Sequence, residues 1–141
     1  MILLAAILTL TLAPIAVLHA YWGFGGVWPG SDAADCARRV GGFRGVRAMP
    51  SPAACFTVAA AIAIAALVPM FLVGRFGALS ALAGLGVALV FLGRGVAGFT
   101  PAWRRHTPEQ PFASLDVRYY SPLCLAIGIG FAVLTFKELP S

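Results

Sequence analysis

Three chemically active residues stand out because apolar sequence surrounds them. His19 lies near the end of the first apolar stretch, Arg94 near the end of the third, and Asp116 shortly before the fourth. A histidine can carry a proton or bind a metal near neutral pH. An arginine can pair with a carboxylate or hold an anionic group through charge-assisted hydrogen bonds. These residue types therefore permit proton transfer, metal binding or recognition of an anionic head group.

Arg94 carries the strongest single signal. A guanidinium at the centre of a bilayer costs about 2.5–3.5 kcal/mol on insertion scales, but Arg94 lies nearer the end of its apolar stretch than the middle. One interpretation is that it snorkels to the head groups. The other is that it pairs with Asp116 and organises a polar pocket, for which His19, Arg118 and Tyr120 are further candidates.

The other conspicuous side chains have simpler interpretations. The only histidine besides His19 is His106, in a loop rich in arginine and proline, so we favour a packing role for His19 and expect no metal or haem. Trp22, Trp28 and Phe112 fit either an interfacial aromatic belt or a lid over a pocket between helices.

The sequence lacks the motifs that are typical of several enzyme classes. It has no phosphate-binding loop with its lysine, no nucleophile elbow and no His-Glu-x-x-His, and its three cysteines form no C-x-x-C pair. The net charge of +5 comes largely from arginines in loops beside apolar segments, which membrane insertion explains without a nucleic-acid partner. We therefore expect no catalytic residues and no cofactor.

Four apolar stretches must position these side chains. Hydrophobic residues make up 60% of the 141-residue chain and charged residues 11%, against about 25% charged residues in soluble domains. A membrane-spanning helix needs about 20 apolar residues, which predicts spans near 2–22, 53–73, 78–99 and 120–136. The sequence thus predicts an all-α, integral membrane four-helix bundle that forms a single domain in the lipid bilayer.

Four spans place both long loops, 23–52 and 100–121, on one face of this bundle. The other face receives both termini, Arg75 and Lys137. Because cytoplasmic loops carry an excess of arginine and lysine, we expect a multi-pass protein of the cell inner membrane with both long loops in the cytoplasm and both termini outside. The loop-side arginines are Arg38, Arg39, Arg44, Arg47, Arg104, Arg105 and Arg118.

The first loop contains the signature of a short helix. Asp32 is a suitable N-cap, Asp35 follows in the first turn, and Gly41 is a stop signal. Asp35 and Arg39 are four residues apart and can form an ion pair.

Three motifs at the loop face carry a resemblance to a known family. They are His19-Ala-Tyr-Trp22 with Gly25-Gly-Val-Trp-Pro29, then Arg94-Gly-Val-Ala-Gly98, then Phe112-Ala-Ser-Leu-Asp116-Val-Arg-Tyr-Tyr120-Ser-Pro-Leu. In this order they resemble domain-of-unknown-function family 3995, a bacterial membrane family. The resemblance covers nearly the whole chain and implies a small four-helix membrane protein, without an established activity.

Three functions remain open. The first is an accessory or interaction subunit of a membrane complex, docking on other subunits or on its own copies through small residues spaced four apart, such as Gly84 with Ala88 and Gly93 with Ala97. The second is a lipid- or isoprenoid-binding protein or enzyme with a polar site at the cytoplasmic face. The third is a small dimeric transporter, suggested by prolines within the first two spans.

Overall fold

Four long helices dominate the computed structural model, which describes residues 1–74 and 77–138. They are α1 (Ile2–Gly23), α3 (Pro52–Val73), α4 (Ala78–Ala97) and a helical segment that runs from Phe112 to Glu138. Each is long and apolar enough to cross a membrane. No strand occurs within the described residues. The predicted all-α membrane bundle is therefore confirmed, while Arg75 lies outside the described residues.

The fourth long segment starts earlier than the sequence suggested. It consists of α6 (Phe112–Leu115), the π-helical segment η1 (Asp116–Tyr120) and α7 (Ser121–Glu138). The prediction of 120–136 treated the polar motif before residue 120 as loop, because its charges and tyrosines interrupt the apolar pattern. The motif is instead helical, so its side chains have a fixed register relative to α7.

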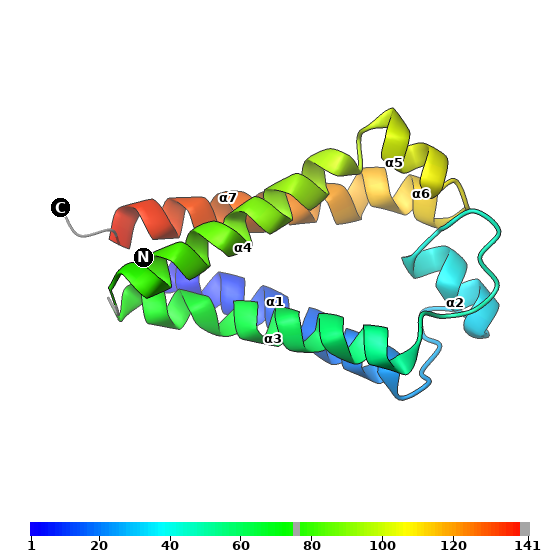
Figure 1. Ribbon diagram of the computed structural model, residues 1–141, viewed down its shortest axis with the longest axis horizontal. Coiled ribbons are helices and arrows are strands. Elements are labelled where there is room, and N and C mark those ends of the chain that lie inside the picture. The colour runs from blue at the N-terminus through cyan, green and yellow to red at the C-terminus, as the bar shows by residue number, and fades with distance from the viewer. Residues whose placement is uncertain (75–76, 139–141) are drawn as a thin grey trace.

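The long helices form two antiparallel pairs, α1 with α3 and α4 with α7 (Figure 1). The pairs meet at the end of the molecule that holds the two termini, and they diverge toward the end that holds the loops (Figure 1). The core that joins the two pairs is one-sided, because it lies toward the end where the pairs meet. Its buried members are Ala5, Leu8, Leu12, Ala65, Ala66, Val68, Leu72, Ala88, Ile127, Phe131 and Leu134.

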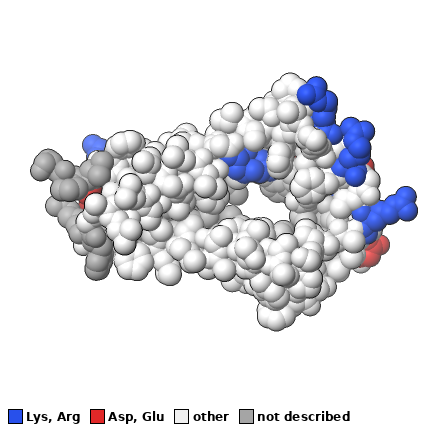
Figure 2. All heavy atoms as spheres, viewed as in Figure 1, with Lys and Arg blue, Asp and Glu red and all other residues white. Residues whose placement is uncertain are grey.

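An opening lies between the two pairs on the loop side of this core. Figure 2 shows it as a hollow in the space-filling surface, with basic atoms at its border on the side of α4 and α7. The atoms around it are otherwise almost entirely neutral (Figure 2). The bundle is thus tightly packed at one end and divided at the other.

Both long loops contain short helices. In the first loop, α2 (Ala33–Val40) begins after Asp32, whose carboxylate accepts a hydrogen bond from the Asp35 amide at 2.8 Å. The Asp35–Arg39 ion pair is present at 2.9 Å, which confirms the predicted loop helix. In the second loop, sequence reasoning missed α5 (Pro101–His106), although Thr100-Pro101 is a helix-start signal: the Thr100 hydroxyl accepts from the Trp103 amide at 3.3 Å.

The two loops bind each other and so bridge the diverging helix pairs. The Glu109 carboxylate accepts a hydrogen bond from the Gly45 amide at 2.9 Å, and the Glu109 amide donates to the Gly42 carbonyl at 3.1 Å. The Arg44 guanidinium donates to the carbonyl of Arg105 at 3.0 Å. These contacts hold α5 and α6 in position above the ends of α4 and α7.

Candidate functional site

Arg94 and Asp116 form an ion pair where α4 ends and the fourth helical segment begins. The Arg94 Nη2 to Asp116 Oδ1 distance is 2.6 Å. The Asp116 side chain is only 3% exposed, whereas that of Arg94 is 29% exposed. Burying a carboxylate is costly unless it is paired and hydrogen-bonded, so Arg94 compensates Asp116 while part of its own guanidinium stays accessible.

Two further side chains complete the coordination of Asp116. The Trp103 indole Nε1 donates to Asp116 Oδ2 at 2.9 Å, and the Ser121 hydroxyl donates to Oδ1 at 3.1 Å. Arg94 also donates from Nη1 to the Ser121 oxygen at 3.2 Å, and its Cζ lies 4.6 Å from the centre of the Trp103 ring. We call Arg94, Trp103, Asp116 and Ser121 the Asp116 cluster.

The π-helical turn explains how Ser121 reaches Asp116. In η1 the Ser121 amide donates to the Asp116 carbonyl, which is the i to i+5 bond of a π-helix. An ideal α-helix would place residue 120, rather than 121, over residue 116. The extra residue in the turn therefore puts the serine hydroxyl beside the carboxylate. Single π-turns of this kind are often found at functional sites.

Gly98 allows α4 to approach the cluster. A Cβ atom built at this position would overlap the Ser121 hydroxyl and would lie 3.1 Å from Asp116 Oδ2. Only glycine leaves room for the hydrogen-bonded network at the end of α4. About one turn of helix thus separates the cation from the glycine that leaves room for Asp116 and Ser121.

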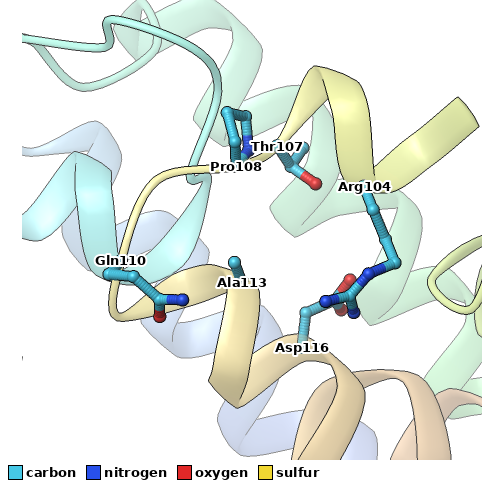
Figure 3. Close-up of a pocket in the computed structure, with 6 residues that line it drawn as sticks. All are labelled: Arg104, Thr107, Pro108, Gln110, Ala113 and Asp116. Carbon is cyan, nitrogen blue, oxygen red and sulfur yellow. The ribbon is translucent and has the colours of Figure 1, made fainter. Parts of the chain in front are cut away.

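A cavity lies on the other side of Asp116, toward the loops. Its volume is about 210 Å³. Figure 3 shows Arg104 reaching into it from α5 with its guanidinium directed toward Asp116, and Gln110 on the opposite wall. The lining residues are Arg104, Thr107, Pro108, Gln110, Ala113 and Asp116. Asp116 thus faces both this cavity and the Arg94 side of the cluster.

The remaining predicted pocket residues take other partners. His19 Nδ1 lies 2.8 Å from the Ile15 carbonyl of its own helix, and its ring packs edge-on against Trp22 with centres 4.9 Å apart. Since a carbonyl can only accept, Nδ1 carries the proton. No hydrogen bond within the described residues links His19 to the Asp116 cluster.

Tyr120 and Arg118 also point elsewhere. The Tyr120 hydroxyl donates to the Arg39 carbonyl at 3.3 Å, which ties the fourth helical segment to the first loop. The Arg118 guanidinium is exposed and lies 5.5 Å from the centre of the Tyr119 ring. Of the five candidates for the polar pocket, the structure therefore brings Arg94 and Asp116 into direct contact.

The candidate lid aromatics separate into exposed and buried members. The Trp22 indole donates to the Trp28 carbonyl at 2.7 Å, and the Trp28 side chain is exposed. Phe112 is buried, with its ring 5.7 Å from that of Tyr120. These residues stabilise the loops around the cluster, and none of them contributes a hydrogen bond to it within the described part of the chain.

Sequence reasoning missed Trp103, Ser121 and the cavity residues of α5. Sequence reasoning included no role for Trp103 in the pocket, although its position three residues after the Thr100 cap could have placed it on a helix facing Asp116. Ser121 was part of a quoted motif, but its role depends on the π-turn. Among the described residues, no three His, Cys, Asp or Glu side chains lie close enough to hold a metal ion.

Comparison with known proteins assigns the chain to a family. No curated protein and no solved structure matches it. A family model described as "Protein of unknown function (DUF3995)" matches residues 12–131, a range that contains the whole Asp116 cluster and the cavity beside it. The chain belongs to this DUF3995 family of proteins of unknown function.

Proposed function

We propose that this protein binds an amphiphilic lipid, of the phospholipid or isoprenoid class, between its two helix pairs. The observation that carries the proposal is the partial exposure of Arg94, 29%, in an ion pair whose other member is buried. Part of the Arg94 guanidinium therefore remains free to bind a second anionic group. An amphiphile would place its polar end against Arg94 and its chains between the helices.

The one-sided core supports this location. All the buried core residues of α1 lie in its first half, at positions 5, 8 and 12, and those of α3 lie at 65–72 in its second half. Toward the loops, each helix packs on its own partner and the pairs diverge (Figure 1). Apolar surfaces that face each other without contact lose dispersion energy, so an acyl or isoprenoid chain between them would restore those contacts.

We place the protein in the inner membrane of a bacterium, with both long loops in the cytoplasm and both termini outside. The support is the excess of arginine in the two long loops over the opposite face. In this orientation the Asp116 cluster lies at the cytoplasmic level of the head groups, where anionic lipids are available.

Native mass spectrometry from lipid nanodiscs tests the proposal. The wild-type protein should retain lipid after the nanodisc is stripped, at one molecule per chain. The double variant Arg94→Gln with Asp116→Asn removes both charges and keeps neutral hydrogen-bonding groups, so it should fold and lose most of the retained lipid. Arg118→Gln is the matched control, because Arg118 is an exposed cation of the same segment that makes no contact with the cluster.

Absence of retained lipid in the wild type, or equal retention by the double variant and the wild type, would overturn the proposal.

The same spectra report the mass of any bound protein, which addresses a second candidate function. We propose, as that second candidate, an accessory subunit that docks on the outer face of α4. Gly86 and Gly93 lie seven residues apart with open space beside both, which permits close approach of another helix.

A further inference from the structure

The cavity between α5 and α6 has bonding capacity that the protein does not use. It is separate from the opening between the helix pairs, because its lining comes from α5, the segment that follows it, α6 and Asp116 (Figure 3). Three polar groups other than the carboxylate line it: the guanidinium of Arg104, the hydroxyl of Thr107 and the amide of Gln110.

Hydrogen bonds within the protein determine which atoms of these three groups remain free. The Thr107 hydroxyl donates to the Trp103 carbonyl at 3.0 Å. The Gln110 Oε1 accepts from the Ser114 hydroxyl at 2.8 Å, so the free part of its amide is the donating NH₂ group. The Arg104 guanidinium makes no hydrogen bond or ion pair with any described residue. The unused groups of Arg104 and Gln110 are therefore donors, and the Thr107 hydroxyl has already used its proton.

The charge of the cavity is positive. Asp116 contributes a carboxylate, but Arg94 neutralises it at 2.6 Å, and the two neutral donors Trp103 and Ser121 occupy its oxygens further. Arg104 then remains as one uncompensated cation directed toward the floor of the cavity (Figure 3). A cavity with net positive charge and free N–H donors recognises an anion. The planar fork of an arginine fits the oxygens of phosphate best.

We propose that this cavity binds a phosphate group through Arg104 and the Gln110 amide. The inference rests on the proposed function, since it assigns the phosphate of the bound lipid to this cavity and leaves Arg94, on the other side of Asp116, to the rest of the polar end. The cavity volume of about 210 Å³ is smaller than the roughly 300–1,000 Å³ of pockets that enclose whole ligands. It therefore accepts the phosphate, while the rest of a lipid lies outside it. Phosphate from the cytoplasm has the same chemistry, so the experiment separates the two sources.

The test uses the full chain in dodecyl maltoside, a detergent without phosphate. Phosphatidylglycerol, diacylglycerol with the same acyl chains, and inorganic phosphate are titrated separately, with native mass spectrometry for the lipids and ³¹P line broadening for phosphate. Arg104→Gln removes the cavity cation. Arg105→Gln removes the same charge from the next residue of α5, which does not line the cavity. Circular dichroism checks that both variants fold.

We expect phosphatidylglycerol to bind more tightly than diacylglycerol. Arg104→Gln should abolish this preference by weakening phosphatidylglycerol about ten- to a hundredfold, as loss of a charge-assisted hydrogen bond does, and Arg105→Gln should preserve it. Binding of the lipid without binding of inorganic phosphate identifies a head-group site. Arg104-dependent broadening of the phosphate signal supports the same cavity with a soluble source.

Two results would overturn the inference. Equal losses in Arg104→Gln and Arg105→Gln would show that bulk charge, rather than the cavity, attracts the anion. Equal affinity for phosphatidylglycerol and diacylglycerol, with no phosphate binding, would remove the phosphate site and leave the proposed lipid binding intact. Failure of both lipids and of phosphate to bind would remove the proposed function as well.

Discussion

At the scale of single residues, the Arg94–Asp116 pair is asymmetric. Asp116 is enclosed and depends on Arg94, Trp103 and Ser121, whereas Arg94 is part exposed and can reach the head groups if its partner is lost. Breaking a buried ion pair is costly mainly because the remaining charge stays buried without compensation. The two members of this pair should therefore differ in what their removal costs.

We expect Arg94→Met to destabilise the protein more than Asp116→Asn. The first change leaves a buried carboxylate with only neutral donors and should cost about 3–5 kcal/mol. The second leaves an arginine that can turn toward water, and the asparagine can still accept from Trp103 or Ser121. Thermal unfolding in detergent, followed by circular dichroism, measures the difference. A larger loss in Asp116→Asn would contradict the assigned burial.

Substitution of Gly98 by alanine should also lower the stability of the protein. Alanine there would overlap the Ser121 hydroxyl, and overpacking of this kind typically costs about 1–3 kcal/mol. Gly93→Ala is the control in the same helix, because no atom lies within 4 Å of a Cβ at that position, and it should leave stability unchanged or raise it slightly. Equal effects of the two substitutions on the unfolding temperature would be inconsistent with the close contact at Gly98.

At the scale of helices, the sequence predicted more about the long elements than about the short ones. Length and apolarity were sufficient for the four spans, and the order of the spans placed Arg94, at the end of the third, and Asp116, before the fourth, at the same end. The π-turn at Asp116–Tyr120 and helix α5 were not predicted. One extra residue in a turn depends on the balance of local hydrogen bonds, which apolar periodicity does not report.

Helix α2 gives a pH-dependent prediction at this scale. The hydrogen bond from Arg39 lowers the pKa of the Asp35 carboxyl, and the bond from the Ser31 amide lowers it further. Because the pKa in the folded state is below that in the unfolded state, the contribution of this pair is present above the ordinary aspartate pKa. It is lost as pH falls through the lowered value.

We expect Arg39→Gln to raise the pKa of Asp35 toward its ordinary range. The carboxyl ¹³C chemical shift of Asp35, titrated by NMR, measures this directly. Arg44→Gln serves as the control, since Arg44 bonds to the second loop instead. An unchanged titration of Asp35 in Arg39→Gln would mean that the ion pair does not persist in solution.

At the scale of the whole molecule, the proposed lipid site depends on which helices pack together rather than on how many helices there are. The sequence indicated four spans, but it did not predict that α3 packs mainly on α1 and α4 mainly on α7. This pairing leaves the opening toward the loops (Figure 2). The pairing depends on small residues that let two helices approach closely. Within the α4–α7 pair, Gly95 lies against Leu125 and Gly128 lies against Leu92.

The two long loops join the helix pairs across the opening. Glu109 binds the backbone of the first loop, and Tyr120 reaches the carbonyl of Arg39. The Asp116 cluster and its cavity thus lie under a bridge that is built from both loops, at the end where the helices diverge.

The most direct measurement is an experimental density map of the wild-type protein in lipid nanodiscs, at a resolution that shows single acyl chains. We expect one elongated density between the α1–α3 and α4–α7 pairs, ending beside Arg94. A map in which the two pairs close on each other along their full length, with side chains in contact and no such density, would contradict this expectation.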